Sequence, residues 1–176
     1  MKISNSSWKS QLSRVLSLKF PAHNDSGFKL AVLGVGNEFR ADDIAGLLVV
    51  RAIQARVNSS PHLLLLEGGL APENFTGKIR AFNPDVLLLC DAADMGLKPG
   101  EVRWLSPLEM DGYSASSHTL PLSVLSQFVK EDIGCEIGVL GIQVAALEMY
   151  QPVSEEVYRA AEELAVDLLE LLRMLH

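Results

Sequence analysis

The chain contains little cysteine. Only Cys90 and Cys135 occur among its 176 residues. Both stand in apolar surroundings, and they lack the C-x-x-C spacing of zinc and redox sites. A disulfide framework or a cysteine metal site is therefore disfavoured, and we expect two buried, reduced thiols. Reduced thiols are typical of the cytoplasm, which is the compartment that we expect.

Positive charge and long apolar runs are also scarce. Fifteen Lys and Arg residues oppose 22 Asp and Glu residues, which gives a formal net charge of -7 and no basic cluster. Because nucleic acids and anionic membranes are bound by basic patches, neither is expected as a partner. No apolar run is long enough to cross a bilayer, and the first residues lack the apolar stretch of a secretory signal. Membrane insertion and secretion are therefore not expected.

Several common enzyme motifs are missing. Gly34 and Gly36 are not followed by the third glycine of a dinucleotide-binding turn, and no G-x-x-x-x-G-K-[ST] phosphate loop occurs. Ser116, Ser117 and His118 are neighbours in the sequence, but no G-x-S-x-G elbow accompanies them. Nucleotide binding and serine hydrolase chemistry therefore have little support.

The composition divides the chain into an extension over residues 1–28 and one domain over 29–176. The extension is rich in Ser and Lys, and its apolar residues share one helical face: Trp8, Leu12, Val15, Leu16 and Phe20. Pro21 to Gly27 is typical of a linker. The predicted helix either serves targeting or docking, or simply covers part of the core.

From residue 29 onward, apolar strands alternate with helical patterns. Strands are predicted over 29–35, 62–67, 86–91, 101–105 and 137–143, and helices over 43–57, 73–82, 120–132 and 154–175. Residues 106–117 are predicted to form a polar loop. The alternation predicts an α/β fold with a mainly parallel, twisted sheet of about five strands and helices on both faces.

The segment AVLGVGNEFRADDIAG joins the first predicted strand to a helix. Gly34 and Gly36 allow a tight turn, and either Asp42 or Asp43 can cap the helix. Because one acid suffices for the cap, the other is available for chemistry where open α/β sheets bind ligands, beyond the carboxyl end of a strand. The alternative is a charged first turn that the helix dipole favours.

Two more polar residues are expected at the same edge of the sheet. Asp91 ends a predicted strand, and His118 precedes a helix in a loop that returns to that edge if the crossovers are right-handed. Each also has a structural alternative, since Asp91 can brace a loop and His118 can be solvated. Two carboxylates and one imidazole suit Ni, Zn, Fe or Mn with open positions, which fits metal-assisted hydrolysis of a peptide bond.

With these residues in view, the chain resembles the hydrogenase maturation endopeptidases. The resemblance covers nearly everything after residue 28 and rests on several ordered motifs: GVGNEFRADDIAG, LEGGLAPEN, CDAADMGLKPGE, SSHTLPLSVL, EDIG and LGIQ. The last three motif groups are most similar to those of the protease that serves the hydrogenase of formate hydrogenlyase and related energy-converting hydrogenases. Ile44 departs from the pattern, because many members have glycine there. The resemblance implies an aspartyl-type peptidase that removes the carboxy-terminal tail from the precursor large subunit of a nickel-iron hydrogenase.

The resemblance also implies roles for individual residues. Asp43, Asp91 and His118 match the family's nickel-interacting triad and are expected to be catalytic as well. The nickel is expected to arrive in the substrate, and zinc or cadmium can substitute for it. The residues expected to bind substrate are Gly36, Asn37, Glu67, Gly68 and Gly69, although Glu67 can instead brace its turn. The alternative function is a nickel-sensing, chaperone-like binding module that cuts no bond.

Overall fold

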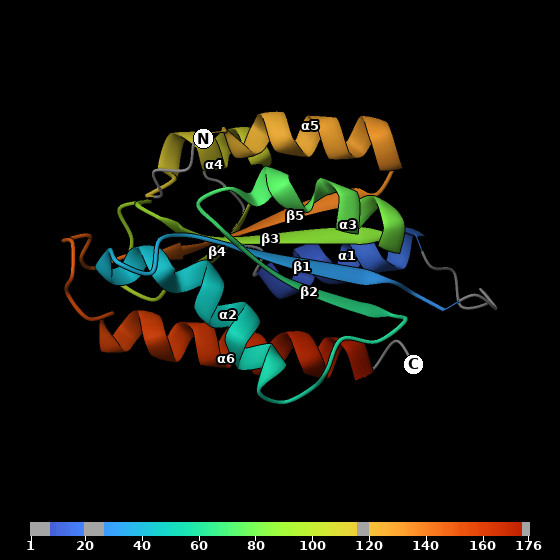
Figure 1. Cartoon of the computed structure of the whole chain (residues 1–176). Coiled ribbons are helices and arrows are strands. Elements are labelled where there is room, and N and C mark those ends of the chain that lie inside the picture. Colours follow the sequence, from blue (N-terminus) through green and yellow to red (C-terminus); the bar gives the residue numbers. More distant parts are fainter. Residues whose placement is uncertain (1–7, 20–26, 116–119, 174–176) are drawn as a thin grey trace, which may run out of the picture.

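The computed structural model describes residues 8–19, 27–115 and 120–173. Five strands form one sheet in the order β2-β1-β3-β5-β4 (Figure 1). Their bounds are β1 Leu30–Val35, β2 Leu63–Gly69, β3 Val86–Ala93, β4 Val102–Leu105 and β5 Glu136–Gln143. Only β4 runs antiparallel to its neighbour, β5, among the described pairings. The predicted mainly parallel sheet of about five strands is confirmed.

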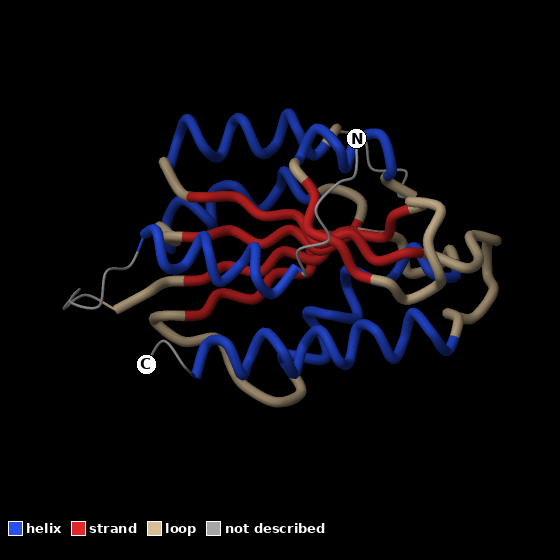
Figure 2. The backbone as a smooth tube through the Cα atoms, turned by 180° about the vertical axis from the view of Figure 1, so that it is seen from behind, coloured by secondary structure: helices blue, strands red, loops and turns tan. Residues whose placement is uncertain are grey.

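The central strands β1 and β3 are buried along their whole length. Side chains alternate between two apolar cores, with Val32 and Leu88 on one side and Leu33 and Leu89 on the other. Helices cover both faces, so a strand can be apolar at every position without exposing that surface to water (Figure 2). Burial on both sides explains why these strands appear in the sequence as continuous apolar runs.

The helices divide between the two faces of the sheet. Helices α1 Trp8–Lys19, α2 Ala45–Gln54 and α6 Glu155–Arg173 pack on one core, and α3 Thr76–Phe82, α4 Pro107–Tyr113 and α5 Leu122–Ile133 pack on the other. In α1, Trp8, Leu12 and Leu16 are buried in the first core, so this helix covers the domain. The expected fifth apolar residue, Phe20, and most of the expected linker lie outside the described residues.

The predicted polar loop over 106–117 is wrong in its first half, because α4 occupies Pro107–Tyr113. Ser106 and Glu109 form a reciprocal capping box, and Pro107 occupies the first helical turn. The hydrogen bonds donated by the backbone and side chain of Ser106 lower the pKa of the Glu109 carboxyl. Such a box satisfies the amide groups at a helix start and allows a short polar segment to become helical.

Two single-turn helices precede α2 and α3: η1 Ala41–Ile44 and η2 Pro72–Phe75. The paired aspartates therefore lie in η1, and α2 begins only at Ala45. Both cysteines are buried and free, as predicted. Within the described ranges, every helix is too short or too polar to span a bilayer.

Three glycines bring the start of α2 against the sheet. A Cβ atom added to Gly46 would overlap the carbonyl oxygens of Val35 and Cys90, and one added to Gly34 would overlap the carbonyl oxygen of Gly46. Gly36 has a φ of +146°, and its Cβ would overlap the carbonyl oxygen of Asp43. These contacts place the acidic turn directly above the ends of β1 and β3.

We predict that Gly46→Ala lowers the free energy of unfolding by about 3 kcal/mol, because a methyl group there collides with rigid strand backbone. Gly77→Ala is the control, since no atom lies within 4 Å of its added Cβ; a change of at most about 1 kcal/mol is expected there. Urea denaturation followed by circular dichroism measures both. If Gly46→Ala were as stable as the wild type, the close contact between Gly46 and the strand backbone would be contradicted.

Candidate active site

The candidate site lies at the edge of the sheet where the parallel strands end, called here the carboxyl edge. Asp42 and Asp43 follow β1 in η1, whereas Asp91 lies inside β3 opposite Gly141 of β5. Cα atoms of η1 and β3 approach within 8 Å. All three carboxylates are fully buried. Because ionised carboxylates are rarely buried without compensating partners, the partners of each one indicate its role.

The carboxylate of Asp42 is a structural clamp. Its Oδ2 accepts hydrogen bonds from the amides of Ala145 at 2.7 Å and Ala146 at 2.9 Å, and from Ser154 Oγ at 3.0 Å. Its Oδ1 accepts a hydrogen bond from the Ser154 amide at 2.7 Å. The expectation that Asp42 or Asp43 caps the helix is wrong, because the N-cap of α2 is Ile44 and no side chain caps it. Asp42 holds the segment between β5 and α6 instead.

Asp43 has different surroundings. Its Oδ2 lies 3.7 Å from Nη1 of Arg40, which supplies a compensating positive charge beside the buried carboxylate. Its carbonyl oxygen accepts a hydrogen bond from the Asn37 amide at 3.1 Å. Backbone contacts therefore help to close the turn that carries Asp43.

Arg40 ties three segments of the carboxyl edge together. Besides facing Asp43, its Nη1 donates a hydrogen bond to the carbonyl oxygen of Ala115 at 2.7 Å, and its Nε donates one to that of Leu147 at 3.0 Å. Sequence reasoning missed this residue. Its partners lie 75 and 107 positions away, so no local pattern could have identified it.

Asp91 is held by its neighbours on the sheet. Oδ1 accepts a hydrogen bond from the Ala92 amide at 2.8 Å, and Oδ2 accepts one from Ser114 Oγ at 3.1 Å. The adjacent Cys90 is also buried, and burial, aided by the charge of Asp91, raises the pKa of its thiol to about 12. The Asp91 carboxylate is thus fixed in place by a backbone and a side-chain donor.

The third expected member of the triad, His118, lies outside the described residues, as do Ser116 and Ser117. Among the residues that the structure does describe, no three His, Cys, Asp or Glu side chains are grouped to hold a metal ion. The described part of the site consists of Asp43 and Asp91, with Arg40 and Ser114 joining them to the segment that leads to position 118. The metal assignment remains a prediction.

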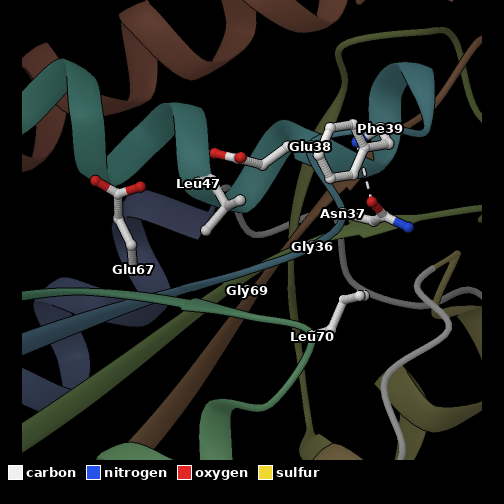
Figure 3. Close-up of a pocket in the computed structure, with 8 residues that line it drawn as sticks. All are labelled: Gly36, Asn37, Glu38, Phe39, Leu47, Glu67, Gly69 and Leu70. Atoms are coloured by element: carbon white, nitrogen blue, oxygen red, sulfur yellow. Dashed lines mark hydrogen bonds between the residues drawn. The ribbon is translucent and has the colours of Figure 1, made fainter. Parts of the chain in front are cut away.

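A cavity of about 290 Å³ opens beside the acidic turn, between the ends of β1 and β2 (Figure 3). Of the residues expected to bind substrate, four line it, and they are Gly36, Asn37, Glu67 and Gly69. Gly68 does not line it, because this residue is buried against Leu33 and Pro72. The lining is completed by Glu38, Phe39, Leu47 and Leu70.

An ion-pair cluster forms one wall of the cavity. Arg51 of α2 donates from Nε to Glu67 Oε2 at 2.9 Å, and its Nη2 contacts the carboxylates of both Glu38 and Glu67. The hydrogen bond to Glu38 is the largest cause of a raised pKa of the Arg51 guanidinium. Glu67 therefore braces the wall, and its carboxylate also borders the cavity, so bracing and substrate contact are compatible.

Comparisons with known proteins agree with this architecture. A family model described as hydrogenase maturation protease matches residues 47–171. The hydrogenase 3 maturation protease of Escherichia coli (strain K12) is 38% identical over 132 residues, which cover 74% of this chain and 83% of that protein.

Solved structures show the same similarity. The crystal structure of the NiFe hydrogenase maturation protease HycI from Thermococcus kodakarensis KOD1 matches with a TM-score of 0.76 and 34% identity, covering 85% of this chain and 95% of the other. The solution structure of the endopeptidase HycI from Escherichia coli matches with a TM-score of 0.67 and 34% identity, covering 84% and 89%.

We predict that Asp42→Ala lowers the free energy of unfolding by about 3 kcal/mol, because it leaves amides at Ala145, Ala146 and Ser154 without their acceptor. Asp132→Ala is the matched control: its carboxylate accepts an exposed bond from Arg80, and a change within about 0.5 kcal/mol is expected. Thermal and urea unfolding measure both variants. Equal effects of the two substitutions would contradict a clamp at Asp42.

Proposed function

Because the chain belongs to the hydrogenase maturation protease family, we propose that it removes the carboxy-terminal tail of the precursor large subunit of a nickel-iron hydrogenase. The chain is an enzyme, since its relatives are proteases and endopeptidases. The substrate is a protein, and its nickel is part of that substrate. The similarity to the hydrogenase 3 protease favours the large subunit of a formate hydrogenlyase type of hydrogenase.

One observation carries this proposal: two buried carboxylates, Asp43 and Asp91, lie at the carboxyl edge, and the turn that carries Asp43 borders a cavity of about 290 Å³ through Asn37. Asp42, their equally buried neighbour, is occupied by four hydrogen bonds that hold the chain together. The carboxylate of Asp43 faces Arg40 instead. Buried ionisable groups beside a specific charge partner cluster at functional sites.

The donor set suits the nickel of the substrate. Asp43 and Asp91 supply carboxylate oxygens, and His118 would supply an imidazole nitrogen, a combination that borderline divalent metals accept. Three protein ligands leave room for ligands that come with the precursor. A metal ion held in this way polarises a carbonyl group and lowers the pKa of bound water. Zinc or cadmium would enter the same ligand set.

The protein groups act on the scissile segment by position and charge. Arg40 keeps the Asp43 carboxylate in place from one side, and Ser114 does the same for Asp91. Asp43 and Asp91 are then the candidate general bases for the attacking water. The Gly36 and Gly69 backbone, with Asn37 and Glu67, borders the cavity in which the neighbouring part of the substrate would lie.

Asp43→Asn tests the catalytic assignment. We predict that it slows precursor processing at least about 100-fold, because loss of a catalytic carboxylate typically costs that much. The free energy of unfolding should change by less than about 1 kcal/mol, since the amide has nearly the same shape. Asp94→Asn is the matched control, because Asp94 lies at the same edge but is exposed. Mass spectrometry of the precursor over time gives both rates.

Asp94→Asn should process the precursor within about two-fold of the wild-type rate. Full processing by Asp43→Asn would remove Asp43 from the mechanism. Loss of processing in both variants would instead indicate that any charge at this edge is needed, which would contradict the specific role of Asp43.

His118→Ala tests direct contact with metal. We predict that it weakens nickel or cadmium binding at least about 10-fold, because losing a direct ligand costs no less than losing a residue that supports one. His62→Ala is the control, since His62 precedes β2 at the opposite end of the sheet. Isothermal titration with each ion measures the affinities. An unchanged affinity of His118→Ala would exclude His118 as a ligand.

A further inference from the structure

Two aromatic side chains at the carboxyl edge are exposed, yet they are held in place. Phe39 is 61% exposed and Tyr150 is 80% exposed. The Tyr150 amide donates a hydrogen bond to the Phe39 carbonyl oxygen at 2.6 Å, and their ring centroids are 6.3 Å apart with planes tilted by 53°. The Phe39 amide in turn donates to Asn37 Oδ1 at 2.9 Å. A direct contact therefore joins the turn after β1 to the segment between β5 and α6 (Figure 1).

The backbone around this pair adopts an unfavourable conformation. Tyr150 has a φ of +62°, and Ala41, two residues after Phe39, has a φ of +40°. Residues other than glycine rarely adopt a positive φ angle. Where such residues do occur, they cluster at functional sites. Hydrogen bonds hold the chain near these residues: Asp42 accepts from the amides of Ala145 and Ala146, and Arg40 donates to the Leu147 carbonyl oxygen.

The rigidly held aromatic pair does not contribute to the core. Met149, the neighbour of Tyr150, is also an exposed large apolar residue, and so is Leu70 beyond the end of β2. Phe39 and Leu70 line the cavity beside the acidic turn (Figure 3). We call Phe39, Leu70, Met149 and Tyr150 the aromatic platform. Phe39 and Leu70 join it to the cavity, and Tyr150 is joined to it through Phe39. Phe39 lies four residues before Asp43 in the same turn.

We propose that the aromatic platform is the docking surface for the precursor large subunit, and that it binds an apolar patch on the precursor next to the segment that is cut. This inference rests on the proposed function. Rigid, amphipathic aromatic side chains are the residues that most often dominate protein interfaces, since they bury much area and lose little entropy. A protease for one folded protein needs binding energy from contacts away from the scissile bond.

The platform occupies the place where such contacts must form. A chain that occupies the cavity lies against Phe39 and Leu70, which line it with Gly36 and Gly69. The rest of its protein then meets Tyr150 and Met149. The clamp by Asp42 and the link through Arg40 thus serve docking as well as the fold, because they hold the segment that carries Tyr150 against the turn that carries Asp43.

The test compares Phe39→Ala/Tyr150→Asn with Leu108→Ala/Phe128→Ala. Asparagine tolerates the positive φ at position 150, so the first variant removes the rings and retains the backbone. Leu108 and Phe128 are 76% and 48% exposed on α4 and α5, away from the platform. Steady-state cleavage of the nickel-loaded precursor gives KM and kcat for each, and sedimentation velocity gives the oligomeric state.

We expect the platform variant to raise KM at least about 10-fold and to lower kcat by less than about three-fold, since two interface anchors are lost. The control variant should change neither constant by more than about two-fold. If the double variant does not fold, Tyr150→Asn alone, with a rise in KM of at least about three-fold, decides the question.

Three outcomes would overturn the docking proposal. An unchanged KM in the platform variant would show that the precursor does not use this surface. A loss of kcat alone would assign Phe39 and Tyr150 to the shape of the site. Self-association of the wild type that the platform variant abolishes, with KM unchanged, would make the surface an interface between copies. Failure of the wild type to cut the precursor would instead refute the proposed function.

Discussion

The buried carboxylate of Asp42 joins two distant stretches of the chain, and the carboxyl edge of the sheet is organised around that junction. Its four hydrogen bonds reach Ala145, Ala146 and Ser154, more than 100 positions along the sequence. They fix the segment after β5 over the turn after β1. Buried carboxylates need such partners, and these partners meet Asp42 only because the sheet brings the ends of β1 and β5 to the same edge.

Asp43 follows Asp42 directly in the chain, and its buried carboxylate faces Arg40. Close contacts at Gly34, Gly36 and Gly46 press the acidic turn onto β1 and β3, which brings Asp43 and Asp91 to the same edge. Arg40 lies between Asp43 and the Ala115 carbonyl, while the Ala115 amide donates to the Ala92 carbonyl oxygen at 3.0 Å. The chain therefore leaves Ala115, just before the segment with His118, from a fixed point next to both aspartates.

The sequence alone predicts the sheet well, because each strand is a local apolar run whose burial on both faces requires that composition. Helix α4 was not predicted, because the polar composition of its segment favoured a loop. Its capping box of Ser106 and Glu109 is a local signal for a helix start. The predicted helix cap by Asp42 was wrong for another reason. A cap is a local contact, whereas the actual partners of Asp42 reach it only in the assembled sheet. The contacts of Arg40 and the contact between Phe39 and Tyr150 could not be predicted from the sequence either, because they also join residues that are far apart in the chain.

We propose that the chain cuts a large-subunit precursor, and that it cuts only a precursor that carries nickel. The most direct measurement incubates the purified protein with nickel-loaded and nickel-free precursor from its own source and determines the mass of each product. We predict that the carboxy-terminal tail is lost from the nickel-loaded precursor alone. Cleavage of both precursors would contradict the nickel dependence of the reaction. A stable complex with an intact, nickel-loaded precursor would contradict the cleavage activity and favour a binding module.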